Sequence, residues 1–506
     1  MMKKNLLKSW VLTIMVIVIV SCNSNNDIKL PEPNVISYPG IPVLNMKDFK
    51  LPACSDYKVE EYIISGNATS YMQTKAPDGN GVWTVEEKDT ASYVSRIVVM
   101  KPKDDSKFNG TVIVDWINVT GGFDFTPSRN MMWKEITRSG AIYVAVSAQQ
   151  VGLVGGETIG GFAMPLKERK GGRYTQVKHP GDAFSFDIFS QVGRFLKGDN
   201  SSVVLGKLKP KHVIALGESQ SAFYMCTYVN AVDPIAKVYD GFFIHSRLGL
   251  GAPLEGVDII DFVNTTTPMK LTTKLRVPTL VFTTETDVLG VINEKMGMIG
   301  AFLARQPEND KLRIWEVAGT AHHDSYLHKV SRVDTCGGSY ADIAKAYEPT
   351  NKMLFMKLDK PFNNAPQHHY VLEAAMSALQ KWIGEGVIPE KTQQLEIVVD
   401  SDNKLAAHAV TDELGNIIGG IRSPWMDVPV SVLSSQPSSE SFNALLIGHT
   451  EPFSPEKLDE LYPGGINEYL QKFENSLNKD IMEGHILAAD KEEIMEVARL
   501  SYKGTH

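Results

Sequence analysis

The chain has 506 residues, of which 43% are hydrophobic and 22% are charged, and its formal net charge is −8. This length exceeds one average domain and allows a sizeable core, and the composition is ordinary for a soluble globular protein. The acidic balance argues against nucleic acid as a partner, because no basic run occurs outside the N-terminus.

The N-terminus has the pattern of an export signal. Three lysines precede the apolar run 11–20, which is too short to span a bilayer comfortably. Cys22 follows a small serine, as at a bacterial lipoprotein cleavage site, whereas a plain signal anchor would not require this cysteine. We therefore expect a lipoprotein signal peptide over 1–21, a lipid on Cys22 and a polar tether over 22–45. The protein is then exported and lipid-anchored, on the periplasmic face or the cell surface of a bacterial membrane.

Three further cysteines remain, so at most one disulfide can form within the chain. An exported protein permits one, but the sequence favours no pairing, and Cys226 is expected in the core. No Cys/His cluster has the spacing of zinc ligands. The adjacent pair His368-His369 is expected as a polar cap before a helix over 370–384, and we expect neither a metal nor a cofactor.

Strand-like and helical segments alternate through residues 46–391. This alternation predicts one α/β domain, with a mostly parallel sheet and helices on both of its faces. The expected strands are 94–100, 111–119, 141–148, 212–216, 239–245, 279–284 and 312–317. The expected helices include 183–196, 220–229 and 374–382.

The segment 213–222 joins an apolar strand to a helix through the turn Gly-Glu-Ser-Gln-Ser. A serine at such a turn is exposed at the end of its strand, and the turn needs small neighbours, which Gly217 and Ser221 provide. Backbone N–H groups at the start of the helix can stabilise a developing oxyanion. The pattern predicts Ser219 as a nucleophile, although so short a motif also occurs in buried turns with an ordinary serine.

Two later strands end in the residue types that a serine nucleophile needs, in the required chain order. A strand introduced by proline runs into Glu285 and Asp287, and the next strand runs into a small-residue loop with His322 and His323. An imidazole must take the proton of the serine, and a carboxylate must orient that imidazole. We predict His322 as the base, with His323 as its rival, and Asp287 as the acid, with Glu285 as the alternative.

The oxyanion site needs a second donor from the loop after an earlier strand. The strand 111–119 runs into a glycine turn near that place. We predict the backbone of Asn118 or Val119, together with that of Gln220, as the donors. The alternative is that the glycines only form a turn.

Two irregular segments at the same edge of the sheet are candidate lids or caps. One is the glycine-rich stretch 149–180, and the other is 246–276. Tyr174, His179 and Arg247 are candidate substrate contacts, each with a purely structural role as the alternative.

After about residue 392 the pattern changes to short strands and helices. This C-terminal extension, 392–506, is too short and mixed for an independent module, so we expect it to pack on the core. Trp425 is expected either in a pocket or, more often for a tryptophan, in the core. The expected elements are strands at 395–399 and 406–410 and helices at 455–461, 466–478 and 491–501.

Three stretches together resemble a known family. They are G-E-S-Q-S at 217–221, T-E-T-D at 284–287 and W-E-V-A-G-T-A-H at 315–322, and they resemble the bacterial α/β-hydrolase-domain family with a G-x-S-Q-S nucleophile turn. The resemblance spans roughly residue 40 to the C-terminus. It implies the α/β-hydrolase fold and an esterase-like activity, with natural substrates that are mostly unassigned.

The sequence therefore predicts a serine hydrolase that forms an acyl-enzyme, most directly a carboxylic ester hydrolase acting on a small-molecule ester. A serine peptidase or amidase with the same triad is one alternative. A lipid-anchored binding protein on a hydrolase scaffold is another. The acyl and alcohol parts of the substrate and the oligomeric state do not follow from the sequence.

Overall fold

The computed structural model describes residues 31–75, 81–158, 163–256, 267–293, 296–353, 356–439 and 444–505. The predicted signal peptide, Cys22 and the start of the tether lie outside these residues. Glu32–His506 form one compact unit. Within the described ranges, no helix combines the length and the hydropathy that a membrane crossing requires.

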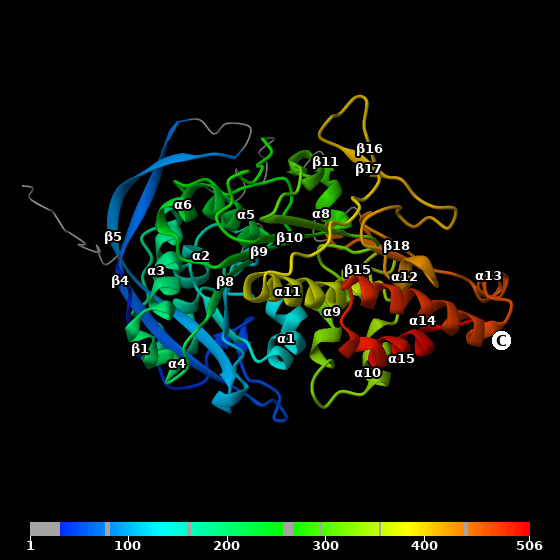
Figure 1. The fold of residues 1–506 in the computed structure, drawn as a ribbon, viewed down its shortest axis with the longest axis horizontal. Helices are drawn as coiled ribbons and strands as arrows, with labels where there is room; N and C mark the ends of the chain where they lie inside the picture. Colours follow the sequence, from blue (N-terminus) through cyan, green and yellow to red (C-terminus); the bar gives the residue numbers. More distant parts are fainter. Residues whose placement is uncertain are drawn as a thin grey trace, which may run out of the picture. The chain divides into compact units, whose positions relative to one another are not determined.

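A nine-stranded sheet forms the centre of the described structure (Figure 1), with the order β1-β4-β5-β7-β6-β8-β9-β10-β13. The parallel strands are β6 (Thr111–Trp116), β7 (Ile142–Val146), β8 (His212–Glu218), β9 (Gly241–His245), β10 (Thr279–Thr284) and β13 (Leu312–Val317). Antiparallel strands extend one edge, namely β1 (Asn34–Ser37), β4 (Tyr57–Lys75) and β5 (Thr84–Pro102). The predicted mostly parallel sheet is thus confirmed.

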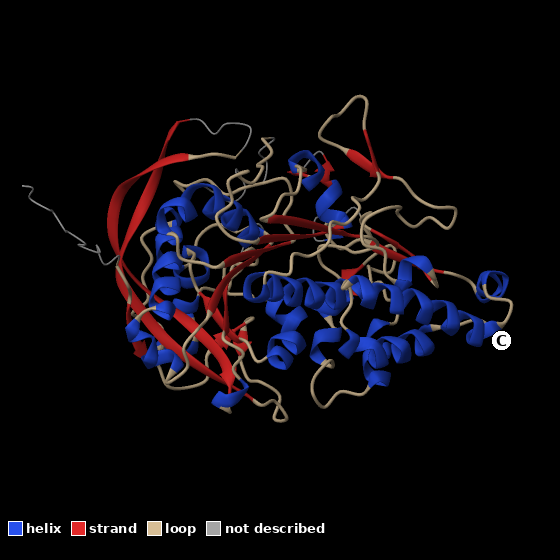
Figure 2. Ribbon diagram, in the orientation of Figure 1, coloured by secondary structure: helices blue, strands red, loops and turns tan. Residues whose placement is uncertain are grey.

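Alternate residues of the strands face two separate cores, because side chains on a strand point to opposite faces. In β6, Ile113 packs into one core, whereas Val112 and Val114 pack into the other. The first core contains residues of α1 (Pro127–Ser139) and α11 (Gln367–Glu385), and the second contains residues of α3 (Ser185–Lys197) and α5 (Gln220–Thr227). Because helices cover both faces of the sheet (Figure 2), its parallel strands are nearly continuous apolar runs.

The strand order reverses around β6. The chain goes from β6 to β7 on one side and later enters β8 on the other side, with Trp116 of β6 paired with Gly217 of β8. In open α/β sheets, ligands bind at the carboxyl ends of the strands at such a reversal. The loops after β6 and β8 are therefore the ones that the topology places around a binding site.

The C-terminal extension packs on the α1 and α11 side of the sheet. Trp425 stacks on Tyr370 of α11, with ring centroids 5.7 Å apart and planes at 1°, so Trp425 belongs to the core. The elements of the extension include β16 (Ile397–Val399), β17 (Ala407–Ala409), α13 (Pro455–Leu461), α14 (Gly465–Glu483) and α15 (Lys491–Ser501).

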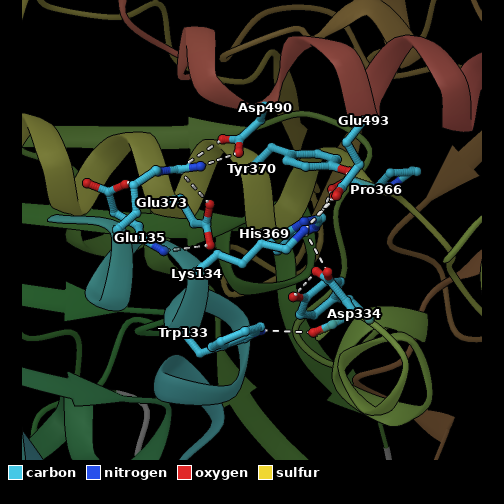
Figure 3. A network of polar contacts seen from close by, with 12 residues as sticks. Trp133, Lys134, Glu135, Asp334, Pro366, His369, Tyr370, Glu373, Asp490 and Glu493 are labelled. Carbon is cyan, nitrogen blue, oxygen red and sulfur yellow. Dashed lines mark hydrogen bonds and ion pairs between the residues drawn. The ribbon is translucent and has the colours of Figure 1, made fainter. Parts of the chain in front are cut away.

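Buried ion pairs fasten this extension to the core (Figure 3). Lys134 Nζ of α1 lies 2.6 Å from Asp334 Oδ1 and 2.7 Å from Glu493 Oε2 of α15. Arg138 Nη1 of α1 lies 2.6 Å from Oδ1 of Asp490, just before α15. Removal of one partner from a buried pair costs about 3 to 5 kcal/mol, so these contacts hold α15 in place.

The structure differs from two expectations about local structure. Residues 34–37, expected in the tether, form β1 and pair with β4, because β4 offers an open edge of backbone hydrogen-bonding groups. His368 and His369 stand at the start of α11, as expected, but they lie inside its first turn and are buried. His369 stacks on Tyr326 with ring centroids 3.9 Å apart, which explains its place inside the core.

A disulfide joins Cys54 to Cys336, with the two Cα atoms 6.0 Å apart. It connects the segment before β4 to the loop before α10 (Tyr340–Tyr347). Cys226 is a buried free thiol, as expected.

Candidate active site

Ser219 stands at the sharp turn between β8 and α5. Its backbone has φ 56° and ψ −120°, a strained conformation for a residue with a side chain. A Cβ atom at Gly217 would lie 2.6 Å from the carbonyl oxygen of Ser221, so the turn requires glycine there. The Ser219 N–H donates to the carbonyl of His245 at the end of β9 (3.0 Å), which ties the turn to the neighbouring strand.

Ser219, His322 and Asp287 form a hydrogen-bonded line. Ser219 Oγ lies 2.9 Å from His322 Nε2, and His322 Nδ1 lies 2.6 Å from Asp287 Oδ1. Burial lowers the pKa of His322, but the charge of Asp287 and its hydrogen bond outweigh burial, and the net pKa lies above its ordinary value. The arrangement suits an imidazole that accepts the serine proton while a carboxylate stabilises the imidazolium.

Asp287 is held by a capping box at the start of α8 (Glu285–Leu289). Its Oδ2 accepts hydrogen bonds from the backbone N–H and the hydroxyl of Thr284, at 2.8 and 2.7 Å. With Oδ2 fixed in this way, Oδ1 faces His322. The structure therefore places Asp287, and not Glu285, beside the imidazole.

Glu285 serves a different purpose. One of its carboxylate oxygens accepts from the N–H of Gly319 at 3.0 Å, and the other accepts from the N–H of Ser435 at 3.1 Å. Glu285 thereby joins the histidine loop to the C-terminal extension.

The hydrogen bond to Ser219 comes from His322, and His323, the rival base, has other neighbours. Its backbone N–H donates to the carbonyl of Leu446, and its ring lies 6.1 Å from that of His328. Burial lowers the pKa of His323 to about 4, so this ring stays neutral.

The loop after β6 supplies a second candidate oxyanion donor. The N–H of Asn118 already donates to the carbonyl of Phe125 at 3.1 Å, so it is not available to a substrate oxyanion. The structure therefore does not support Asn118 as the predicted second donor. The N–H of Val119 donates to the side-chain oxygen of Gln220 at 3.4 Å. The N–H groups of Val119 and Gln220 therefore remain the candidate oxyanion donors.

Glu218 is a site residue that the sequence reasoning missed. Its Oε1 lies 3.9 Å from His322 Nε2, and its Oε2 accepts from the side-chain amide of Asn118 at 3.0 Å. Burial raises the pKa of Glu218 to about 8. Its position in the sequence could have indicated a place in the site, because Glu218 directly precedes the predicted nucleophile at the end of a buried strand.

A cavity of about 550 Å³ opens beside this turn. Val119, Gln220 and Tyr224 line it from the side of the sheet. Both predicted lid or cap segments contribute to its wall, for example with Gln150 and Pro253. This volume is within the usual range for small-molecule sites.

The three predicted substrate contacts do not line this cavity and have structural partners instead. Tyr174 is buried and donates to Glu61 at 3.0 Å. His179 donates to the carbonyl of Ala148 at 2.8 Å. Arg247 is buried and donates to the carbonyl of Leu248 at 3.0 Å. Each polar group is thus paired with another part of the protein, and the sequence pattern does not indicate such partners.

The chain order of serine, acid and histidine on a mostly parallel sheet agrees with the comparison to known families. Residues 29–496 match the family described as alpha/beta hydrolase domain. The chain belongs to this family. The α/β-hydrolase fold expected from the sequence is thereby confirmed.

No curated protein matches the chain. Among solved structures, an α/β serine hydrolase without a lid from Xanthomonas campestris has 8% identity and a TM-score of 0.28, over 52% of this chain and 87% of that one. An esterase from the fungus Rhizomucor miehei has 14% identity and a TM-score of 0.22, over 44% and 66%. The esterase Est22 has 12% identity and a TM-score of 0.25, over 46% and 64%. Likenesses this distant do not indicate a substrate.

Proposed function

We propose that this α/β-hydrolase protein is a serine carboxylic ester hydrolase. The observation that carries the proposal is the line of Ser219, His322 and Asp287, at 2.9 and 2.6 Å, beside a cavity of about 550 Å³. A serine hydroxyl is a weak nucleophile unless an adjacent base takes its proton.

In the first half of the reaction, Ser219 Oγ attacks the ester carbonyl while His322 Nε2 takes its proton. Asp287 stabilises the imidazolium, and the N–H groups of Val119 and Gln220 stabilise the oxyanion of the tetrahedral intermediate. When the intermediate collapses, the bond to the alcohol oxygen breaks, and His322 protonates the leaving alkoxide. Water, activated by the same imidazole, then cleaves the acyl-serine to the free acid.

The charge of the cavity supports a neutral ester over an anionic one. Glu157, Asp182 and Glu255 contribute carboxyl groups to the lining, and none of its described residues is basic. A substrate with a free carboxylate or phosphate would meet only like charges there. A neutral aryl ester should therefore be hydrolysed faster than its carboxylate-bearing analogue.

The test uses soluble protein starting after Cys22 and p-nitrophenyl esters of short and medium chain length. We expect turnover that disappears in Ser219→Ala and persists in Ser221→Ala, a matched control because Ser221 Oγ is buried in the same turn without a hydrogen-bond partner. A fluorophosphonate should label the wild type and not Ser219→Ala. Labelling without ester turnover, combined with cleavage of an aryl amide, would favour an amidase. Absence of both labelling and turnover would refute a hydrolase and favour a binding protein.

We also propose that the protein is exported and lipid-anchored through Cys22. The disulfide between Cys54 and Cys336 supports this, because structural disulfides persist in oxidising compartments outside the cytosol. Cys22→Ser should move the protein from the detergent phase to the aqueous phase in a detergent partition of bacterial lysate. An unchanged partition would contradict the anchor.

A further inference from the structure

Three metal-ligating side chains come together where α14 ends, outside the catalytic site. Asp480 and Glu483 stand in the last turn of this helix, and His485 follows the left-handed cap residue Gly484 (φ 80°). One ligand atom from each of the three side chains lies within 4.8 Å of the other two. His485 Nδ1 and Glu483 Oε2 are 3.5 Å apart.

Asp480 is the unusual member of this cluster. It is 2% exposed, and its Oδ2 is buried with no hydrogen-bond partner among the described residues. A buried carboxylate without a partner is costly. The cost is higher at the carboxyl end of a helix, because the helix dipole is negative there and favours a cation.

We propose that Asp480, Glu483 and His485 bind one divalent metal cation of the zinc type. An imidazole with two carboxylates is a donor set that Zn²⁺ accepts in proteins. The 3.5 Å between the His485 and Glu483 atoms is near the about 3.3 Å that separates two ligands of a tetrahedral Zn²⁺ at about 2.0 Å. The side chain of Glu483 is 45% exposed, so the ion has a path from solvent and water can complete its coordination.

A second cluster shows why this site is distinctive. Asp334, His369 and Glu493 also bring ligand atoms together, but Lys134 Nζ lies between the two carboxylates, 2.6 and 2.7 Å from them (Figure 3). That cluster already holds its cation as an ammonium group. At the end of α14, by contrast, Lys479 is an exposed side chain that reaches Glu483 only at 4.0 Å.

A metal at this position would stabilise the packing of the extension. The ring of Trp315, in β13, packs edge-on against His485, with ring centroids 5.4 Å apart. An ion on His485 would therefore fix the end of α14 against the edge strand of the sheet. It would also lie near an indole whose fluorescence reports its arrival. The inference is independent of the catalytic triad and of the substrate.

The test uses untagged protein treated with a chelator, because a histidine tag binds Zn²⁺ by itself. Calorimetric titration with Zn²⁺ should show one saturable site. The melting temperature should rise by about 3 °C when Zn²⁺ is at about 100 times its Kd. Co²⁺, which quenches nearby indoles, should lower the fluorescence of the wild type more than that of Trp315→Phe.

Asp480→Asn and His485→Ala should weaken Zn²⁺ binding at least about tenfold, since even the loss of an outer partner of a metal ligand has this effect. Glu474→Gln, on the same helix, should bind as the wild type does. If Asp480→Asn does not fold, Glu483→Gln, at an exposed position, carries the same expectation. The proposal is overturned if the wild type shows no saturable binding, or if the ligand variants bind Zn²⁺ as tightly as Glu474→Gln does.

Discussion

The substitution Asp287→Asn tests the triad most sharply, because the structure fixes how an asparagine would sit. Oδ2 of Asp287 accepts from the backbone N–H and the hydroxyl of Thr284, at 2.8 and 2.7 Å. The backbone N–H can only donate, so the carbonyl oxygen of an asparagine must face Thr284. Its NH₂ group then points at His322 Nδ1, where Asp287 now lies at 2.6 Å.

This exchange reverses the tautomer of the imidazole. Nδ1 becomes an acceptor and Nε2 carries the hydrogen, so Nε2 faces Ser219 Oγ as a donor and cannot take its proton. The corresponding change in a well-known serine protease triad lowers kcat about 10⁴-fold, and we expect a loss of the same order here. In free energy, this is about 5.4 kcal/mol of transition-state stabilisation.

The assay is hydrolysis of p-nitrophenyl esters at pH 8, with Glu285→Gln as the matched control. Glu285 accepts from Gly319 and Ser435, so a glutamine there loses one of two hydrogen bonds and should lower the free energy of unfolding by about 1 to 3 kcal/mol. We expect Glu285→Gln to keep most of kcat. If Asp287→Asn keeps most of its activity, or if Glu285→Gln loses the larger factor, the assignment of the acid is refuted.

Three further outcomes follow from other parts of the structure. The value of kcat/KM should fall as the pH drops through a midpoint above 6.5, since the pKa of His322 is raised and its protonated form cannot accept a proton; a midpoint at or below 6.5 would contradict this. Reduction of the bond between Cys54 and Cys336 should lower the free energy of unfolding by about 3 kcal/mol, measured by denaturant titration with and without reductant. Lys134→Met should lower it by about 3 to 5 kcal/mol, with kcat unchanged, since Asp334 and Glu493 lose their shared cation; an unchanged denaturation midpoint would contradict the role of the network.

The central strands of the sheet were predictable because they are buried on both faces. The strands β6 and β8 are runs of apolar residues that no surface element of this length would carry. The long antiparallel strand β4 was missed because its exposed positions interrupt the apolar pattern, and strand β1 was missed within a polar segment. A strand at the edge of a sheet buries few side chains, so its sequence lacks a clear apolar pattern.

The choice between Asp287 and Glu285 remained open from position alone, although a local signal existed. Thr284 followed three residues later by a carboxylate is the pattern of a capping box at a helix start. In this capping box the side chain of Asp287 turns back toward Thr284, which holds one of its carboxylate oxygens. By contrast, the partners of Glu285 come from segments 34 and 150 residues away, and no local sequence pattern predicts such contacts.

The surroundings of the histidine explain how two nearby carboxyl groups take different roles. Asp287 accepts hydrogen bonds from Thr284 and His322, whereas the Glu218 carboxyl accepts one from the side-chain amide of Asn118. Burial raises the pKa of Glu218 to about 8. At neutral pH Glu218 is therefore mostly uncharged, and the charge that orients the imidazole is that of Asp287. Two carboxyl groups near one imidazole thus differ in their environments, and such differences allow them to take different roles. Their difference depends on burial and hydrogen bonds, which the motif Gly-Glu-Ser does not encode.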